Sequence, residues 1–388
     1  MVAAVAVAAV VAMLATAGPA EASRAPDFEA PFPCGQRWSA ETRAGHSPSW
    51  YSIDFNRDDD YRAPVLASAP GIVTTVADVG NTSYGKYVIV DHGRGWTTLF
   101  AHLDEEWVVQ GQRVDQGHVI GLLGTSGGST GPHLHYEQRL DRVDQPAVFH
   151  GKALVYNTEI KSRGCGDVPV VGDWNGDQRT DLGVYRRAAT AKFRLRAPDA
   201  TPIDMPLGTS AVDPVTGDWN GDGVTDLGFW DPRTTTFSLR KPRGIVSTIP
   251  FGGHRDRPVV GDWDGDGRTD VGVFRPGRST FRLRFPDGSM VRVRFGAVGS
   301  TPVTGDWDGD GRSDVGVFDS RSGVWLLRNG DGSSRTVTFG APGSLPVVGD
   351  WNGNGITDLG VWSPQTATYS LRHDRAHKVH LVKWGRPR

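Results

Sequence analysis

The stretch from Gly131 to Glu137 reads Gly-Pro-His-Leu-His-Tyr-Glu, and it sets the expectations for the first part of the chain. In a β-strand, side chains two residues apart project from the same face. His133 and His135 are therefore expected to point together into one cleft. If His135 binds a metal there, His133 stands beside it and is free to handle a proton or a developing oxyanion.

Two upstream stretches supply further polar side chains. Residues 96–100 (WTTLF) form a good strand pattern, and His102 follows two residues later. A neighbouring strand can thus bring His102 beside His133. The other stretch, HSPSWYSID, runs from His46 to Asp54. A catalytic zinc usually takes three protein ligands and leaves one position for water, whose pKa falls to about 7. The residues that fit this count are His46, Asp54 and His135.

These residues resemble, in their order along the chain, the LytM or lysostaphin-type zinc metallopeptidases, which cut peptide bonds in peptidoglycan. The resemblance covers roughly Gln36 to Leu154. Beyond the histidines it rests on Pro64-Val65-Leu66-Ala67, Gly71-Ile72-Val73, Tyr84-Gly85, Val88 to Gly93, Val108, Gly111, Val114, Gly117, Ile120-Gly121 and the Gly124-to-Gly131 loop. It implies a small antiparallel β domain. It also implies zinc held by His46, Asp54 and His135, with His102 and His133 as the catalytic pair, either of which could be the base.

One feature departs from this family's pattern. The first ligand pair is most often His-x-x-x-Asp, whereas seven residues separate His46 from Asp54. His46 is nevertheless the only histidine before His92, so we expect a longer loop between the two ligands. His92 lies in the turn signal Asp91-His92-Gly93 and is predicted to be structural. The remaining histidines are predicted to lie at the surface: His118, His150, His254, His373, His377 and His380.

The N-terminal residues predict export. Val2 to Ala17 is a run of small apolar residues, and Ala20-Glu21-Ala22 before Ser23 has the A-x-A pattern of a cleavage site. We expect a signal peptide over residues 1–22, a short linker over 23–33, and a protein that is secreted, extracellular or wall-bound. An uncleaved membrane anchor is the alternative, although the run is short for a spanning helix.

The cysteines predict a disulfide, and the net charge restricts the classes of binding partner. Cys34 and Cys165 are the two cysteines of the chain, and they bracket the LytM-like segment 34–165. In an oxidising compartment such a pair predicts a disulfide that ties the segment's entry to its exit. The formal net charge of −2 gives no reason to expect nucleic acid or an anionic membrane as partner. We expect a monomer.

Residues 166–388 contain a repeat. Gly-Asp-Trp recurs with its aspartate at 173, 218, 262, 306 and 350, at intervals of 45, 44, 44 and 44 residues. Each unit holds four β-like pieces, which in the third unit are Pro258–Val260, Val271–Phe274, Phe281–Arg284 and Val291–Phe295. Four strands in a unit of this length is the content of one propeller blade. The whole chain is therefore predicted to be all-β, with a small antiparallel metallopeptidase domain followed by a five-bladed β-propeller.

The loop after each Gly-Asp-Trp is rich in carboxylates. In the third unit carboxylates stand at positions 1, 3, 5 and 9, and Gly267 at position 6 permits a sharp turn, which resembles a calcium loop. The units also resemble FG-GAP or integrin-type propeller repeats. The end units are degraded, because Gln178 replaces the glycine and Asn354 replaces a carboxylate, and we expect them to bind calcium more weakly. The predicted calcium ligands are Asp173, Asn175, Asp177, Asp181, Asp218, Asn220, Asp222, Asp226, Asp262, Asp264, Asp266, Asp270, Asp306, Asp308, Asp310, Asp314, Asp350, Asn352, Asn354 and Asp358.

Aromatic residues also recur in register with the repeat. One set is Trp174, Trp219, Trp263, Trp307 and Trp351, and the second is Tyr185, Trp230, Phe274, Phe318 and Trp362. Packing between blades explains this regularity, with a ring of sugar-binding platforms as the alternative. The array ends on a complete fourth strand, so it either closes edge to edge or stays open.

The sequence therefore predicts an exported zinc endopeptidase that acts on peptidoglycan peptides. A calcium-stabilised propeller would position it or attach it to wall glycans or another partner. Two alternatives stay open. One is an inactive protein that binds peptidoglycan or activates a hydrolase, and the other is an adhesive, lectin-like propeller with a vestigial head.

Overall fold

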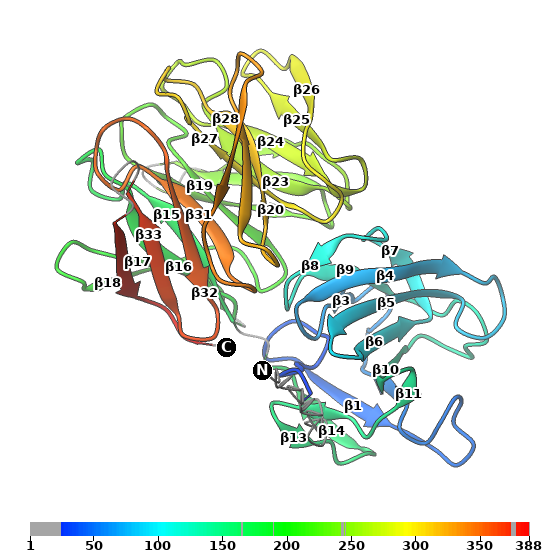
Figure 1. Ribbon diagram of the computed structural model, residues 1–388. Coiled ribbons are helices and arrows are strands. Elements are labelled where there is room, and N and C mark those ends of the chain that lie inside the picture. Colours follow the sequence, from blue (N-terminus) through cyan, green and yellow to red (C-terminus); the bar gives the residue numbers. More distant parts are fainter. Residues whose placement is uncertain are drawn as a thin grey trace, which may run out of the picture.

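The computed structural model describes residues 25–163, 166–188, 190–241, 244, 246–373 and 378–387, and these residues form two parts (Figure 1). An N-terminal domain, blue to blue-green, is followed by five small sheets, green to red. The described chain is built from strands, with a short 3-10 helix, η2 (Pro276–Arg278). No helix among these residues is long and apolar enough to cross a bilayer. The predicted signal peptide, residues 1–22, lies outside the described residues.

One nine-stranded antiparallel sheet organises the N-terminal domain. Its order is β14, β1, β2, β10, β6, β5, β4, β8, with β11 paired to β10. Two smaller sheets, β3-β9-β7 and β12-β13, complete the domain. The strands are β1 (Arg37–Glu41), β2 (Ile53–Asn56), β3 (Pro64–Leu66), β4 (Gly71–Asp78), β5 (Lys86–Gly93), β6 (Trp96–Ala101), β7 (Leu103–Glu106), β8 (Arg113–Val114), β9 (Val119–Leu123), β10 (Leu134–Leu140), β11 (Val143–Asp144), β12 (Val148–Phe149), β13 (Lys152–Ala153) and β14 (Thr158–Lys161).

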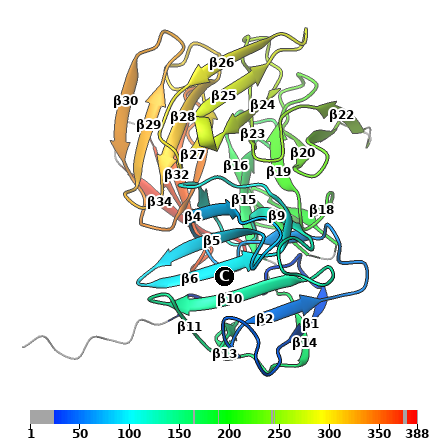
Figure 2. The same ribbon diagram turned by 90° about the vertical axis from the view of Figure 1, so that its right-hand side faces the viewer.

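Strand β10 lies between β2 and β6 and gathers the predicted site (Figure 2). His135 on β10 pairs with Asp54 on β2 on one side and with Ala101 on β6 on the other. His102 follows β6 directly, and His133 precedes β10. Strand pairing therefore brings residues far apart in sequence to one point of the sheet. The predicted strand at residues 96–100 is confirmed as β6.

The residues before Cys34 belong to the core of this domain. Phe32 stacks on Trp38 with ring centroids 3.7 Å apart, and Phe28 packs against Trp96 and His92. Both phenylalanine rings are fully buried. The predicted linker over residues 23–33 is thus wrong for its described part, because burying two such rings gives the segment a stabilising role of its own.

Cys34 is 7% exposed, and the described residues include no free cysteine. Its predicted partner, Cys165, lies outside the described residues. The Cys34–Cys165 bond stays a prediction.

Each of the five C-terminal sheets has four strands that pair antiparallel in chain order. In the third sheet the observed strands match the predicted pieces to within a residue or two. The strands are β15 (Asp167–Gly172), β16 (Asp181–Arg186), β17 (Lys192–Arg196), β18 (Pro202–Pro206); β19 (Asp213–Gly217), β20 (Asp226–Asp231), β21 (Thr236–Arg240), β22 (Val246–Pro250); β23 (Arg257–Gly261), β24 (Asp270–Arg275), β25 (Thr280–Arg284), β26 (Met290–Arg294); β27 (Thr301–Gly305), β28 (Asp314–Asp319), β29 (Val324–Arg328), β30 (Ser334–Thr338); β31 (Leu345–Gly349), β32 (Asp358–Ser363), β33 (Thr368–Arg372) and β34 (Val379–Lys383).

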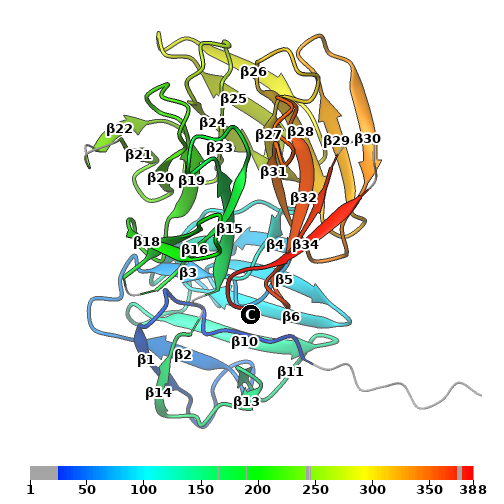
Figure 3. The same cartoon turned by 90° about the vertical axis from the view of Figure 1, so that its left-hand side faces the viewer.

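A repeated pair of hydrogen bonds joins the five sheets in a ring. The amide of Thr225 donates to the carbonyl of Asp173 (2.7 Å), and the amide of Asp173 donates back to the Thr225 hydroxyl (2.9 Å). The same pair links each later loop to the one before it. Thr180 in the first loop bonds Asp350 in the fifth in this way (2.8 and 2.9 Å). The first and fifth sheets accordingly lie side by side, with β15 beside β31 (Figure 3).

The glycine of each Gly-Asp-Trp makes this approach possible. A Cβ on Gly217 would lie 2.5 Å from the methyl carbon of Thr269 in the next loop. The recurring aromatics pack inside the ring as predicted. The second set, Tyr185, Trp230, Phe274, Phe318 and Trp362, is fully buried. In the first set, Trp219, Trp263, Trp307 and Trp351 are at most 7% exposed. Side chains buried to this extent cannot serve as sugar-binding platforms.

The N-terminal domain covers one end of the ring with residues 106–118. Three arginines of the ring donate to backbone carbonyls of this segment: Arg255 to Glu106 (3.0 Å), Arg257 to Arg113 (2.5 Å) and Arg187 to Gly117 (2.7 Å). Trp107 stacks on His254 across the interface at 4.8 Å. A cavity of about 220 Å³ separates residues 115–118 from the starts of the first strands of all five sheets.

Candidate metal centre and catalytic cleft

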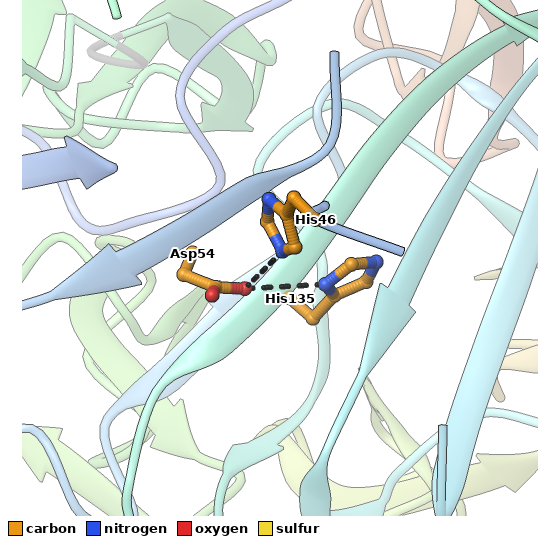
Figure 4. A group of neighbouring side chains, drawn as sticks. All are labelled: His46, Asp54 and His135. Carbon is orange, nitrogen blue, oxygen red and sulfur yellow. Dashed lines mark hydrogen bonds and ion pairs between the residues drawn. The ribbon is translucent and has the colours of Figure 1, made fainter. Parts of the chain in front are cut away.

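Asp54 lies between two histidines at the centre of the site. Its Oδ1 atom is 3.1 Å from Nε2 of His46 and 3.2 Å from Nδ1 of His135 (Figure 4). The three side chains are between 3 and 6% exposed. One candidate donor atom from each lies within 4.8 Å of the other two. The structure thus brings together the three residues that the sequence singled out as ligands.

The long loop between β1 and β2 is held in place by hydrogen bonds of its own. Thr42 lies 3.1 Å from Nδ1 of His46 and donates its hydroxyl to the carbonyl of Trp50 (2.8 Å). Ser49 donates to Oδ2 of Asp144 at 2.8 Å. The extra residues between His46 and Asp54 therefore form a braced loop, and the unusual spacing does not displace His46 from the site.

His102 and His133 face the same cleft from beside the three candidate ligands. Their ring centroids are 4.8 Å apart, and Nε2 of His133 is 3.5 Å from Asp54. Nδ1 of His102 donates to the carbonyl of Ser126 (2.8 Å), and Nδ1 of His133 donates to that of Gly131 (2.9 Å). A carbonyl oxygen can only accept, so each Nδ1 carries a proton, and Nε2 is the nitrogen without a proton in the neutral form of either ring.

A buried network behind His135 was missed by the sequence reasoning. Nε2 of His135 is 2.9 Å from Oε1 of Glu137, which also accepts a hydrogen bond from Tyr84 (2.8 Å). Glu137 forms an ion pair with Arg139, whose Nε reaches Asp144 (3.1 Å). Asp144 is the carboxylate that accepts from Ser49, so the network joins His135 to the loop that carries His46. The signal for Glu137 was its place two residues after His135, on the same face of the strand.

Burial and neighbouring charges shift the pKa values of the site residues in opposite directions. Burial disfavours ionisation of Asp54, but hydrogen bonds from His135 and His46 outweigh it and hold the pKa of this carboxyl far below its usual range. Burial lowers the pKa of His135, yet the contacts with Asp54 and Glu137 raise it overall. At His102, burial and then repulsion from His133 lower the pKa to about 4. His102 is consequently neutral near pH 7, as a proton acceptor must be.

The side chains of the site lie in an open cleft. Its volume is about 210 Å³, and residues 83–84 and 128–130 form walls on either side of the histidines. Arg43 lies at its edge with 70% of its side chain exposed, and its guanidinium pairs with Oδ2 of Asp54 at 2.8 Å. Asp54 thus has one oxygen directed to the histidines and the other held by a cation.

The donor set fits Zn²⁺. Two imidazole nitrogens and one carboxylate oxygen are ligands that zinc takes in catalytic sites, where a further position stays open. A histidine that binds a metal usually donates its other ring N–H to a carboxylate or carbonyl. His135 has such a partner in Glu137. Three buried donors with two unliganded histidines beside them make a class of site suited to metal-dependent hydrolysis.

Comparison with known proteins agrees with this class. Residues 49–146 match the sequence model of Peptidase family M23. The DD-carboxypeptidase/endopeptidase Mpg of Neisseria meningitidis serogroup B is 46% identical over 86 residues, or 21% of this chain and 19% of Mpg. The peptidoglycan DD-endopeptidase ShyA of Vibrio cholerae is 44% identical over 75 residues, 19% of this chain and 17% of ShyA. A crystal structure of a putative peptidase M23 from Pseudomonas aeruginosa is 30% identical, with a TM-score of 0.28, over 33% of this chain and 51% of that one.

The chain therefore contains a domain of the M23 peptidase type. The chain covers about a fifth of the length of each of these two curated relatives. The matched segment includes Asp54, His102, His133 and His135, whereas His46 lies just before it. This boundary coincides with the braced loop, where the spacing of the chain departs from the usual pattern.

The predicted calcium loops share one conformation. In the third loop, Asp262 accepts hydrogen bonds from the amides of Gly265 (2.7 Å) and Gly267 (2.8 Å), and the first aspartate of the other four loops does the same at equivalent positions. Among the described residues, carboxylate oxygens cluster within 4.8 Å in two of the loops, at Asp262, Asp264, Asp270 and at Asp306, Asp308, Asp314. Gln178 adopts a left-handed φ of 64° where the other loops have glycine.

Histidines outside the cleft differ in their surroundings. His92 bonds the carbonyl of Pro70 (2.9 Å) and the hydroxyl of Thr98 (2.8 Å), so its predicted structural role is confirmed. The surface prediction for His118 is wrong, because this half-buried ring lies against the ring of sheets. Burial lowers the pKa of His118 well below its usual value.

Proposed function

We propose that the chain is a zinc metalloendopeptidase that hydrolyses peptide cross-links of bacterial peptidoglycan. The observation that carries this proposal is the convergence of His46, Asp54 and His135 on one point, with His102 and His133 on the open side. An inactive relative would be expected to lack one of these groups, and all five are present.

Zinc, when bound by His46, Asp54 and His135, would polarise the scissile carbonyl and acidify a water molecule. The residues of the chain supply positioning and proton transfer. In the neutral form of His102 or His133, Nδ1 donates to a backbone carbonyl and Nε2 can accept a proton from the attacking water. Once protonated, a histidine can donate to the developing oxyanion or to the leaving amine.

The substrate class is taken from the relatives. ShyA and ShyC of Vibrio cholerae are peptidoglycan DD-endopeptidases. The segment of this chain that matches the model of Peptidase family M23, residues 49–146, holds four of the five site residues. A cell-wall substrate requires action outside the cytoplasmic membrane. This agrees with the predicted signal peptide and with the predicted Cys34–Cys165 disulfide.

We further infer that the ring of five sheets is a β-propeller of the FG-GAP type whose loops bind calcium. The clusters at Asp262 and Asp306 offer oxygen ligands, the kind that calcium prefers. Because each loop bonds the preceding one, calcium in the loops would stabilise the links between sheets. The ring would hold the peptidase domain at the wall.

The test combines metal content with wall hydrolysis. The purified protein is expected to bind about one tightly held zinc and to clear a suspension of purified cell walls, since one three-ligand site is present. Asp54→Ala should lose both properties. Zinc binding without clearing, across walls of several cross-link types, would contradict the enzymatic proposal.

A further inference from the structure

A second cavity lies between the peptidase domain and the ring. Its volume is about 660 Å³, within the range of small-molecule sites. Residues 86, 105–107 and 109 line it from the peptidase domain. From the ring it is lined by residues 253–256, just before β23, and by residues 275 and 277–278, at the turn between β24 and β25. It is therefore formed only when both parts of the chain are present.

One segment of the chain contributes to both this cavity and the metal cleft. Tyr84 lines the cleft, and Lys86, two residues further along the same segment, lines the cavity. Ser126 is hydrogen-bonded to a residue of each region. Its hydroxyl accepts from the amide of Lys86 (2.9 Å), and its carbonyl accepts from Nδ1 of His102 (2.8 Å). The cavity and the metal cleft are therefore neighbours on one segment of the peptidase domain.

The cavity carries an excess of positive charge. Within the described structure, Lys86, Arg255 and Arg278 form no ion pair: Lys86 donates to the carbonyl of Asp104 (2.7 Å), and Arg255 donates to that of Glu106. The Arg278 side chain is exposed and has no hydrogen bond among those residues.

The carboxylates that line the cavity are mostly neutralised. Asp256 pairs with Arg275 at 3.0 Å, and Glu105 pairs with Arg62 at 2.6 Å. Glu106 is the lining carboxylate without an ion pair in the described part of the chain. Three unpaired cations thus face one unpaired carboxylate, which favours an anionic ligand.

We propose that this cavity is a subsite for the free carboxylates of the peptidoglycan peptide, occupied by the part of the substrate that lies beyond the bond being cut. The inference rests on the proposed function, because the ligand is assigned from the cleft that the cavity adjoins. Arg278 and Arg255 from the ring, with Lys86 from the peptidase domain, would bind the carboxylates. The ring of sheets then contributes directly to substrate choice.

Binding can be measured without hydrolysis. The probe is a peptidoglycan stem tetrapeptide with free carboxylates, compared with the same peptide amidated at every carboxylate, and titrated calorimetrically into the full chain carrying Asp54→Ala. The acidic peptide should bind at least about tenfold more tightly, and added salt should weaken it. Equal affinity for the two peptides would overturn the proposal and indicate recognition of uncharged groups.

Charge reversal locates the subsite. Adding Arg278→Glu should weaken binding of the acidic peptide by about tenfold, because an attraction becomes a repulsion, and should leave the amidated peptide unaffected. Arg278→Lys should retain most of the affinity. Arg292→Glu is the matched control, since Arg292 is exposed on β26 of the same sheet and outside the cavity. A loss of affinity as large in the control would overturn the assignment.

Hydrolysis separates failure of the subsite from failure of the proposed function. In the protein without Asp54→Ala, Arg278→Glu should raise KM for acidic peptides and leave kcat nearly unchanged. If the parent clears walls and Arg278→Glu has the same KM as the parent, the subsite proposal is wrong and the peptidase proposal stands. If the parent hydrolyses no substrate, the peptidase proposal is wrong. The binding comparison would still decide whether the cavity binds carboxylates.

Discussion

His135 depends on different partners at its two ring nitrogens. Nδ1 faces Asp54, and Nε2 faces the buried carboxylate of Glu137. Replacing Glu137 by Gln keeps the shape of the side chain and removes the charge that orients and polarises the imidazole. We expect zinc affinity to fall about tenfold or more, measured by competition with a chelator, because second-layer partners typically contribute this much.

A control for this change is Glu159→Gln, at an exposed carboxylate that pairs with Arg37 at 3.4 Å in the same domain. It should bind zinc like the parent. If Glu137→Gln also binds zinc with the affinity of the parent, the network behind His135 does not support the metal.

His133 tests the division of roles among the histidines. Its ring contacts the site without being required for the three-ligand cluster. His133→Ala should therefore keep about one zinc per chain while the rate of peptide hydrolysis falls by roughly 10² to 10⁴, the usual contribution of a general acid or base. Zinc content by mass spectrometry and single-turnover hydrolysis measure the two effects. Loss of zinc from His133→Ala would make it a ligand.

At the scale of elements, the sequence was informative where side chains follow a local period. The spacing of His133 and His135 on a strand and the recurring Gly-Asp-Trp needed no knowledge of the fold. Glu137, Arg139 and Asp144 were not recognised, because their network depends on the pairing of β10 with β11 and on a loop that reaches Asp144 from elsewhere. The closure of the ring was equally invisible, since Thr180 and Asp350 are far apart in the chain.

The loops of the ring should respond to pH and calcium together. Burial raises the pKa of Asp270 to about 7, and burial likewise raises those of Asp226 and Asp314 to about 6. In the unfolded chain these groups titrate near 3.8, so the calcium-free folded state holds extra protons at intermediate pH. Their contribution to stability is complete below about pH 4 and is lost as the pH rises through 6 to 7.

Added calcium should therefore raise the melting temperature of metal-free protein by several degrees more at about pH 8 than at about pH 5, because protons no longer compete for the carboxylates. Differential scanning calorimetry of calcium-free and calcium-loaded protein at the two pH values measures this. The variant Asp270→Asn should reduce the calcium effect. An equal shift at both pH values would show that these carboxylates do not bind the ion.

Closure of the ring can be tested at one residue. Thr180 links the first sheet to the fifth through its amide and its hydroxyl. Thr180→Val removes the hydroxyl acceptor and leaves the Asp350 amide without its partner, which should cost about 1 to 3 kcal/mol of unfolding free energy. Denaturant unfolding measures the loss. Thr366→Val, on an exposed turn of the fifth sheet, is the control and should change stability little.

At the scale of the whole molecule, the peptidase domain and the ring are held together by arginines that reach backbone carbonyls. Arg187 donates to Gly117 and also pairs with Asp213 at 3.1 Å, and Arg257 donates to Arg113. Removing Arg187 breaks a charged hydrogen bond between the two parts and leaves the half-buried Asp213 without its cation. Each effect is destabilising, and together they loosen the docking without touching the metal cleft.

The parent should accordingly unfold in one calorimetric transition, and the double variant Arg187→Ala, Arg257→Ala in two, because the parts lose the contacts that couple them. The separated peptidase domain should still bind zinc, since His46, Asp54 and His135 lie away from the interface. The same variant should lose the preference for acidic peptides, because the subsite needs both walls. Two transitions in the parent, or an unchanged preference in the double variant, would mean that the ring does not hold the cavity together.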